Sequence, residues 1–335
     1  MKARIIPRTL LLAIVALAIG AGIVSVHAQN SGKWTPPRTP WGDPDLQGLW
    51  PGTESLGIPL QRDPKLGTRN ELTEEEFENR LRQAQQAVDD MEAEFDLATA
   101  DTSKAGQVGS ATSPPPHWQE RGTPSRQASL IVDPPDGRMP ALTPQARARY
   151  DAIQAARKGR GPADSYTDRS LYDRCISRGV IGSVLPVIYN NGNEIVQAPG
   201  YVVIRNEMIH ESRIVPLDGQ PHLSPALTSH LGDSRGRWEG DTLVVETKNI
   251  ADRMGLGFNN TGAGAALTIT ERFTRTSDNT LLYLVTVADP MTWTAPFTLQ
   301  MTLERNEGYG MFEYACHEGN LALRNILSGA RATER

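Results

Sequence analysis

The chain has little cysteine, little histidine and few aromatic residues for a length of 335 residues. It contains 2 cysteines and 6 histidines, and Phe, Trp and Tyr together make up 6% of it. It has no Cys-x-x-Cys pair and no His-Glu-x-x-His segment, so no pattern specifies a zinc or thiol-redox centre. No segment repeats at a fixed period, which argues against a solenoid or a propeller.

Positive charge is also scarce. There are 34 Lys and Arg against 39 Asp and Glu, giving a net charge of −5 at pH 7. An acidic chain without a basic cluster is a poor candidate for binding phosphate backbones or anionic lipids. We therefore exclude nucleic acid as the main partner and expect a small-molecule substrate or ligand instead.

The one long apolar run lies at the start of the chain. Basic residues precede the apolar stretch Leu10–Val24, and Val26-His27-Ala28 has the small-x-small form of a cleavage site. We expect residues 1–28 to be a signal peptide, so that the mature protein begins at Gln29 and is periplasmic or secreted. A transmembrane anchor is the alternative, but the apolar core is short, and we expect no membrane span after cleavage.

Export places Cys175 and Cys316 in an oxidising compartment. The pair predicts one disulfide that joins the start of the β region to its last strand. Closing a loop of that length contributes roughly 4 kcal/mol in the chain-entropy description. A reactive thiol or a metal thiolate is the alternative, and the spacing does not support it.

Residues 29–183 are expected to form a mostly helical and irregular segment that wraps around a β domain. Its first part, residues 30–64, is rich in Pro and Trp and suits an arm that docks its rings on a folded surface. A capping box followed by apolar residues at spacings of three and four predicts a helix over Thr73–Leu97. A second helix is expected over Thr143–Lys158, with Pro in its first turn, and a short one over Ser170–Ser177.

From Val184 onward the composition changes, because short β-branched and aromatic runs alternate with turn residues. Nine sequential strands without an intervening helix predict an antiparallel β domain over residues 184–335. We expect a mainly β fold, either an antiparallel β-barrel or a curved sandwich. The expected strands are Val187–Asn190, Glu194–Gln197, Tyr201–Arg205, Met208–Leu217, Thr242–Thr247, Ala266–Thr276, Leu281–Ala288, Phe297–Arg305 and Gly310–Cys316.

Side chains in a strand alternate between its two faces, so spacing predicts direction. Glu271 shares a face with apolar residues on both sides, and a carboxylate in that position must be paired, neutralised or face a cavity. We therefore take Glu271 as a candidate general base or acid. The alternative is a structural ion pair with an interior arginine such as Arg213 or Arg205.

Further candidates for acid–base chemistry are His210, Glu211 and His317. A histidine and a carboxylate raised by burial are common partners for proton transfer, although strict alternation places His210 and Glu211 on opposite faces. The candidate substrate-binding residues are Arg213, Arg235, Asp233 and Trp238, of which the two arginines suit a substrate anion or a developing negative charge.

Two other chemistries have weaker support. Gly232–Gly236 matches the Gly-x-Ser-x-Gly nucleophile pattern around Ser234, but a strand follows it where that elbow needs a helix, so a loop at a barrel mouth is the better reading. A metal site would have to assemble in space alone, and we predict neither a metal nor a cofactor. The residues that suffice for a metal in type are His210, His222, His230, His317, Glu211, Asp233 and Glu318.

Long segments of the chain resemble a family of exported bacterial proteins. They are RTPWGDPDLQGLW (Arg38–Trp50), VDPPDGRMPALTP (Val132–Pro144), EMIHESRIVPLDGQPH (Glu207–His222), GDSRGRWEGDTLVVET (Gly232–Thr247) and YACHEGN (Tyr314–Asn320). The resemblance implies export and carries no catalytic residues over. The β half is also loosely similar to lipocalin-like barrels, which is a likeness of architecture only.

These observations favour an exported enzyme that acts on a small organic substrate in a β-barrel pocket. The expected chemistry is of the lyase, hydratase or isomerase type, or hydrolysis. Two alternatives remain: a lipocalin-like carrier without catalysis, and an envelope interaction protein that uses the Trp-rich arm and the long helix as contact surfaces.

Overall fold

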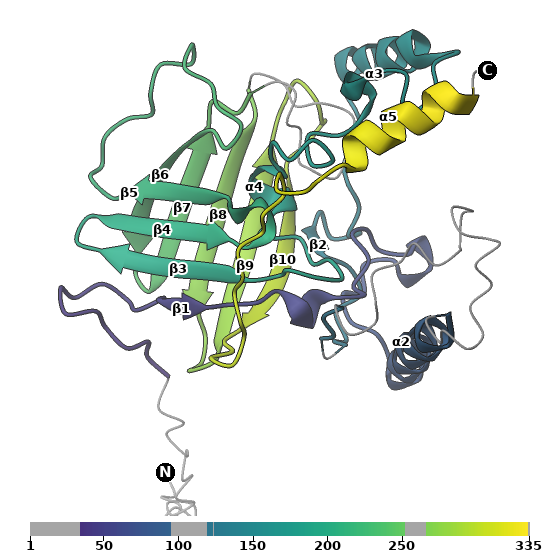
Figure 1. The fold of residues 1–335 in the computed structure, drawn as a ribbon. Coiled ribbons are helices and arrows are strands. Elements are labelled where there is room, and N and C mark those ends of the chain that lie inside the picture. Colours follow the sequence, from purple (N-terminus) through teal and green to yellow (C-terminus); the bar gives the residue numbers. More distant parts are fainter. Residues whose placement is uncertain (1–33, 95–118, 123, 252–265, 334–335) are drawn as a thin grey trace, which may run out of the picture. The chain divides into compact units, whose positions relative to one another are not determined.

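Two antiparallel sheets, of four and six strands, form the core of the structure (Figure 1). The computed structural model describes residues 34–94, 119–122, 124–251 and 266–333, so the predicted signal peptide lies outside the described residues. The sheets have the strand orders β1-β3-β4-β5 and β2-β10-β9-β8-β7-β6. The strands are β1 (Gly48–Leu49), β2 (Ile131–Asp133), β3 (Asn193–Ala198), β4 (Tyr201–Asn206), β5 (Ser212–Pro216), β6 (Asp233–Glu239), β7 (Thr242–Lys248), β8 (Thr268–Arg275), β9 (Thr280–Ala288) and β10 (Phe297–Glu304).

The predicted mainly β fold is confirmed in its sandwich-like form, and the barrel form is wrong. Within the described chain β5 pairs only with β4, and β6 only with β7, so the ladder of hydrogen bonds does not close. The two edges still pack closely, because a Cβ added at Gly236 of β6 would lie 2.8 Å from Val215 Cγ1 of β5. The inner faces of both sheets therefore meet in an apolar core, as in other sandwiches.

The core forms where strict alternation predicts it. In β10 the side chains of Phe297, Leu299 and Met301 are buried, while the residues between them are partly exposed. Side chains from the smaller sheet, such as Ile195 and Val202, join the same cluster. Alternation thus orients each sheet, and burial of apolar area holds the two together.

The segment before residue 184 contributes more than a wrap. β1 pairs with β3, and β2 pairs with β10, so this segment adds an edge strand to each sheet. Neither strand exceeds three residues, which is too short for a periodicity signal.

Two of the predicted helices are confirmed. The backbone N–H of Glu76 donates to Thr73 Oγ1 at 3.3 Å, and that of Thr73 donates to Glu76 Oε2 at 2.8 Å, which completes the capping box.

No described helix is long and apolar enough to cross a membrane. The helices are α2 (Glu74–Glu94), α3 (Pro144–Arg157), α4 (Gly179–Gly182) and α5 (Ala322–Thr333), with 3-10 turns at Thr53–Ser55, Pro64–Leu66, Tyr166–Asp168 and Met208–His210.

Four expected elements are corrected. Ser170–Ser177 forms turns instead of a helix, and neither Val187–Asn190 nor Gly310–Cys316 forms a strand. The expected strand Met208–Leu217 is shortened, because a 3-10 turn precedes β5. In three of these four segments a non-glycine residue has positive φ, which neither a helix nor a strand accommodates.

The loop expected at Gly232–Gly236 is instead the start of β6. Residues 233–236 pair with residues of β7 in the antiparallel sheet. The side chain of Ser234 is buried, and its hydroxyl lies 2.8 Å from Thr247 Oγ1. Gly236 is required here because a Cβ would lie 2.6 Å from Leu217 Cδ2. The Gly-x-Ser-x-Gly match therefore belongs to a strand and forms no nucleophile elbow.

One ion pair bridges the two sheets inside the core. Arg213 of β5 donates to both carboxylate oxygens of Glu271 of β8, at 2.6 and 2.7 Å. The hydroxyl of Tyr283 of β9 donates to the same carboxylate at 2.9 Å. All three side chains are buried, and burial together with Glu271 raises the pKa of Tyr283. The carboxylate thus accepts from an arginine and a phenol, as a buried charge requires.

Replacing Glu271 by Gln should lower the free energy of unfolding by about 3–5 kcal/mol, because it leaves the buried Arg213 guanidinium without a counterion. Denaturant unfolding measures this. The matched control is Glu194→Gln, which breaks the partly exposed pair with Arg205 at 2.8 Å and should cost only about 0–1 kcal/mol. Equal effects of the two substitutions would contradict a structural role for the buried pair.

Candidate functional site

The residues predicted for the site do not form one cluster. Glu271 and Arg213 occupy the core, and their contacts match the alternative of a structural ion pair. The indole of Trp238 packs against the same core, and its Nε1 is buried without a hydrogen-bond partner among the described residues. In this structure these three side chains are packed between the sheets.

Arg235 and Asp233 lie in a second group, at one end of β6. Arg235 donates to Asp233 Oδ1 at 3.2 Å. His222 places Nδ1 2.8 Å from Asp233 Oδ2 and Nε2 3.0 Å from Glu246 Oε1. Burial raises the pKa of Asp233, but hydrogen bonds from the Leu223 backbone, His222 and Arg235 outweigh it, so that the pKa lies below its usual range. The guanidinium of Arg235 thus already has a carboxylate partner.

The remaining predicted histidines are on the surface. His230 and His317 are exposed, as is Glu318. In the part of the chain that the structure describes, no three His, Cys, Asp or Glu residues are grouped so that they could hold a metal ion.

The predicted disulfide between Cys175 and Cys316 is confirmed. It joins two segments that are 141 residues apart in sequence and have little regular structure, residues 170–178 and 309–320. Asn320 strengthens the junction by donating to the carbonyl of Cys316 at 2.8 Å. Polar residues that the sequence analysis named, and others that it did not name, lie in and near the two segments that this disulfide joins.

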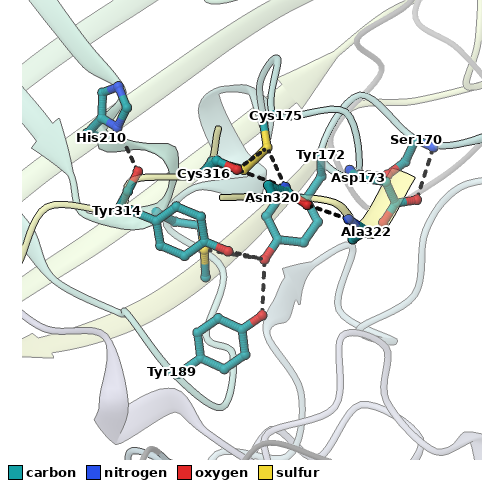
Figure 2. Close-up of a disulfide and its surroundings, with 11 residues drawn as sticks. Ser170, Tyr172, Asp173, Cys175, Tyr189, His210, Tyr314, Cys316, Asn320 and Ala322 are labelled. Atoms are coloured by element: carbon teal, nitrogen blue, oxygen red, sulfur yellow. Dashed lines mark hydrogen bonds between the residues drawn. A yellow bond between two sulfur atoms is a disulfide. The ribbon is translucent and has the colours of Figure 1, made fainter. Parts of the chain in front are cut away.

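Three tyrosine hydroxyls form a chain beside the disulfide (Figure 2). Tyr172 Oη is central, 3.1 Å from the hydroxyls of both Tyr189 and Tyr314, and it also lies 3.5 Å from Met208 Sδ. Burial and the two neighbouring hydroxyls raise the pKa of Tyr172, and burial also raises that of Tyr314. We call these three residues with Arg178 the tyrosine site.

Arg178 supplies the positive charge of the tyrosine site. Its guanidinium carbon lies 4.9 Å from the centroid of the Tyr172 ring, a cation–π contact. No described residue accepts a hydrogen bond from the guanidinium. Burial lowers the pKa of Arg178, and the three tyrosines and Glu211 oppose that effect. The side chain is thus a half-buried cation whose N–H donors have no acceptor within the part of the chain that the structure describes.

Glu211, a predicted catalytic residue, holds the backbone of this site. Its carboxylate accepts hydrogen bonds from the backbone N–H of Arg178 at 3.1 Å and from the hydroxyl of Ser183 at 2.8 Å. The hydroxyl of Ser177 makes a third, short contact. These contacts occupy both carboxylate oxygens and fix the start of α4, next to Arg178.

His210, in the turn before β5, contacts the backbone of Tyr314. Its Nδ1 lies 2.9 Å from the backbone carbonyl of Tyr314 (Figure 2). A carbonyl oxygen only accepts, so Nδ1 carries the hydrogen and Nε2 of the neutral ring keeps its lone pair. The exposed imidazole therefore has a fixed tautomer.

Unusual backbone conformations concentrate here. Of the five non-glycine residues with positive φ in the described chain, four contribute to this region: Cys175, Asn190, Ile209 and His210. A β-branched residue such as Ile209, with φ 58° and ψ 13°, is a marked outlier. Such strain costs on the order of 1–3 kcal/mol per residue and clusters at functional sites.

The sequence reading found Glu211, His210 and the disulfide, but it missed Arg178 and the tyrosines. Tyr172 falls in a segment predicted as a helix, Arg178 directly after it, and Tyr189 and Tyr314 in predicted strands, so no periodicity set them apart. The available signal was compositional and covers two of the three: Tyr172 and Tyr314 lie within five residues of a cysteine, whereas nothing in the sequence marks Tyr189.

A scan against protein-family models finds no match for this chain, and a search of curated proteins finds none either. Function is therefore argued from the site itself.

Replacing both cysteines by Ser should lower the free energy of unfolding by roughly 4–5 kcal/mol, because the crosslink closes a loop of more than a hundred residues. Denaturant unfolding measures the change, and chemically reduced wild-type protein is the matched control that should behave alike. Unchanged stability in both would show that the crosslink does not hold the two segments together.

Replacing Tyr172 by Phe should make stability less sensitive to alkaline pH. The pKa of Tyr172 is raised in the folded state, so its contribution is fully present below the unfolded value of about 10 and is lost as the pH rises through the folded pKa. Urea midpoints between about pH 8 and 11 should fall less steeply for Tyr172→Phe than for wild type or for Tyr150→Phe, a control in α3. Parallel curves would contradict the proposed burial of this hydroxyl.

Proposed function

We propose that the protein is an exported enzyme that holds a small organic anion on Arg178 and promotes a proton transfer beside the hydroxyls of the tyrosine site. The observation that supports this most is a half-buried guanidinium, stacked on Tyr172, for which no described residue supplies a hydrogen-bond acceptor. The confirmed disulfide is consistent with an oxidising compartment.

The guanidinium suits a carboxylate. Its N–H donors form a planar fork that matches two oxygens, and charge-assisted hydrogen bonds of this kind are about twice as strong as neutral ones. Arg178 takes over the anion-holding role that sequence alone suggested for Arg213 or Arg235, since both of those arginines already donate to carboxylates.

The tyrosine chain suits a hydrogen-bond donor. The raised pKa values of Tyr172 and Tyr314 keep both phenols protonated at neutral pH, so they donate hydrogen bonds to a substrate oxygen and stabilise negative charge that develops on it. Three hydroxyls offer three protons, and the two hydroxyl–hydroxyl contacts use two of them. The third is left for Met208 Sδ, a weak acceptor that an oxygen of a bound substrate would displace.

His210 is the complementary proton carrier in this proposal, through the lone pair on Nε2. Its tautomer is set by the carbonyl of Tyr314, whose own hydroxyl belongs to the chain. A histidine base with phenols that donate hydrogen bonds to the substrate serves proton-transfer reactions of the lyase, hydratase or isomerase type.

Binding of small carboxylates, followed by isothermal titration calorimetry, tests the anion site. Arg178→Gln should weaken binding by ten- to a hundredfold, because it removes a charge-assisted pair worth about 1.5–3 kcal/mol. Arg174→Gln is the matched control, since Arg174 also stacks on a tyrosine, at 5.0 Å from the ring of Tyr166. Equal affinities of the two variants would overturn the assignment.

Catalysis is tested in the same experiment. Carboxylates that bind are incubated with wild type and with Tyr172→Phe, which should retain binding but form product at least a hundredfold more slowly. Recovery of every bound compound unchanged from wild type would overturn the enzymatic part of the proposal and favour a carrier.

A further inference from the structure

Large apolar side chains are exposed in the segments that carry two tyrosines of the tyrosine site. Phe312 is 76% exposed and Ile188 is 46% exposed, and each lies within two residues of one of the site's tyrosines, Tyr314 and Tyr189. One exposed apolar residue needs no explanation, but two in the segments of a site that holds a half-buried guanidinium suggest a surface for an amphipathic ligand.

Hydrogen bonds tie these two residues to a common support. The backbone N–H of Phe312 donates to Glu207 Oε1 at 3.3 Å, and the carbonyl of Ile188 accepts from the backbone N–H of Glu120 at 2.8 Å. The hydroxyl of Tyr309 lies 2.6 Å from Glu207 Oε2 and 2.7 Å from Glu120 Oε1. The two apolar residues are thus held through one tyrosine and two carboxylates.

Gly310 sets the position of the Phe312 ring. A Cβ at Gly310 would lie 2.9 Å from the ring, which is closer than Cβ contacts in proteins come. The ring lies against the backbone of Gly310 because no side chain is there. The exposed aromatic face is therefore placed by the local sequence.

The carboxylates of this region limit the charge of a ligand. Glu207 is buried, and its oxygens accept from Asn190 Nδ2, the Gly192 backbone, Tyr309 and Phe312. No described basic residue pairs with it. A ligand with a second negative charge would meet the field of Glu207, Glu120 and Glu211, which repels it.

We propose that the tyrosine site selects aromatic monocarboxylates, and that Phe312 is a specificity-determining residue. This inference rests on the proposed anion-holding role of Arg178. In it, the carboxylate lies on the guanidinium, and the aromatic ring covers the exposed face of Phe312. Stacking of this kind adds to the burial of apolar area.

The test compares benzoate, propionate and the dianion terephthalate by NMR titration of wild type, Phe312→Ala and Phe312→Leu. Wild type should bind benzoate at least tenfold more tightly than propionate or terephthalate, and propionate that fails to bind at the highest concentration counts toward this selectivity. Phe312→Ala should weaken benzoate binding five- to tenfold and change propionate binding less than twofold. Phe312→Leu, which stays apolar, should retain part of the preference.

The outcomes separate the two proposals. Arg178-dependent binding with equal affinity for benzoate and propionate would overturn the aromatic selectivity and leave the anion site standing. An equal loss of both ligands in Phe312→Ala would overturn the role of Phe312. Absence of any carboxylate binding to wild type would overturn the anion site as well. Unfolding of each variant is measured alongside, so that a loss of affinity is not confused with a loss of structure.

Discussion

The bidentate pair between Arg213 and Glu271 is the constraint on which the rest of the structure depends. It is the contact at which a charged group of the smaller sheet enters the core, and it requires Arg213 to face inward from β5. A shift of β5 by one residue would turn Arg213 outward and bury Ile214 in its place. The register of β5 is therefore fixed by charge as well as by apolar burial. A fixed register also fixes the position of His210 and Glu211, which lie just before the strand.

Those preceding residues contact the backbone of the tyrosine site. With Arg213 fixed inward, the chain has only Glu211 and Ser212 in which to pass from the left-handed turn at Ile209 and His210 into the strand. Glu211 then meets Ser177, Ser183 and the backbone of Arg178, and His210 meets the carbonyl of Tyr314. The disulfide links the segment 309–320, which carries Tyr314, to the segment 170–178, which carries Tyr172 and Arg178. The strain at the site is thus offset by a rigid sheet on one side and a covalent bond on the other.

Much of the fold follows from local patterns in the sequence. The alternation in β8 places Glu271 among apolar neighbours and calls for a partner such as Arg213, and the Thr73–Glu76 box opens a helix. The two cysteines, in a chain whose sequence predicts export, imply their own pairing. Each of these features depends on a short stretch of sequence or on one simple chemical requirement, which is why each can be predicted.

The features that could not be predicted depend on distant contacts. Whether the sheets close into a barrel is decided where Gly236 packs against Val215 and Leu217, and no local pattern reports that contact. Arg178 lies in irregular backbone where periodicity gives no direction, and its neighbours Tyr189 and Tyr314 come from segments 11 and 136 residues further along. Only the folded chain brings the cation and the three phenols together.

A crystal structure of the protein with 4-bromobenzoate, phased on the anomalous signal of bromine, tests the central claim most directly. We predict a bromine peak beside the ring of Phe312, with the carboxylate within hydrogen-bond distance of the Arg178 guanidinium. A saturated crystal in which the ligand occupies another surface, or in which the Arg178 guanidinium has no carboxylate on it, would contradict the assignment of this site.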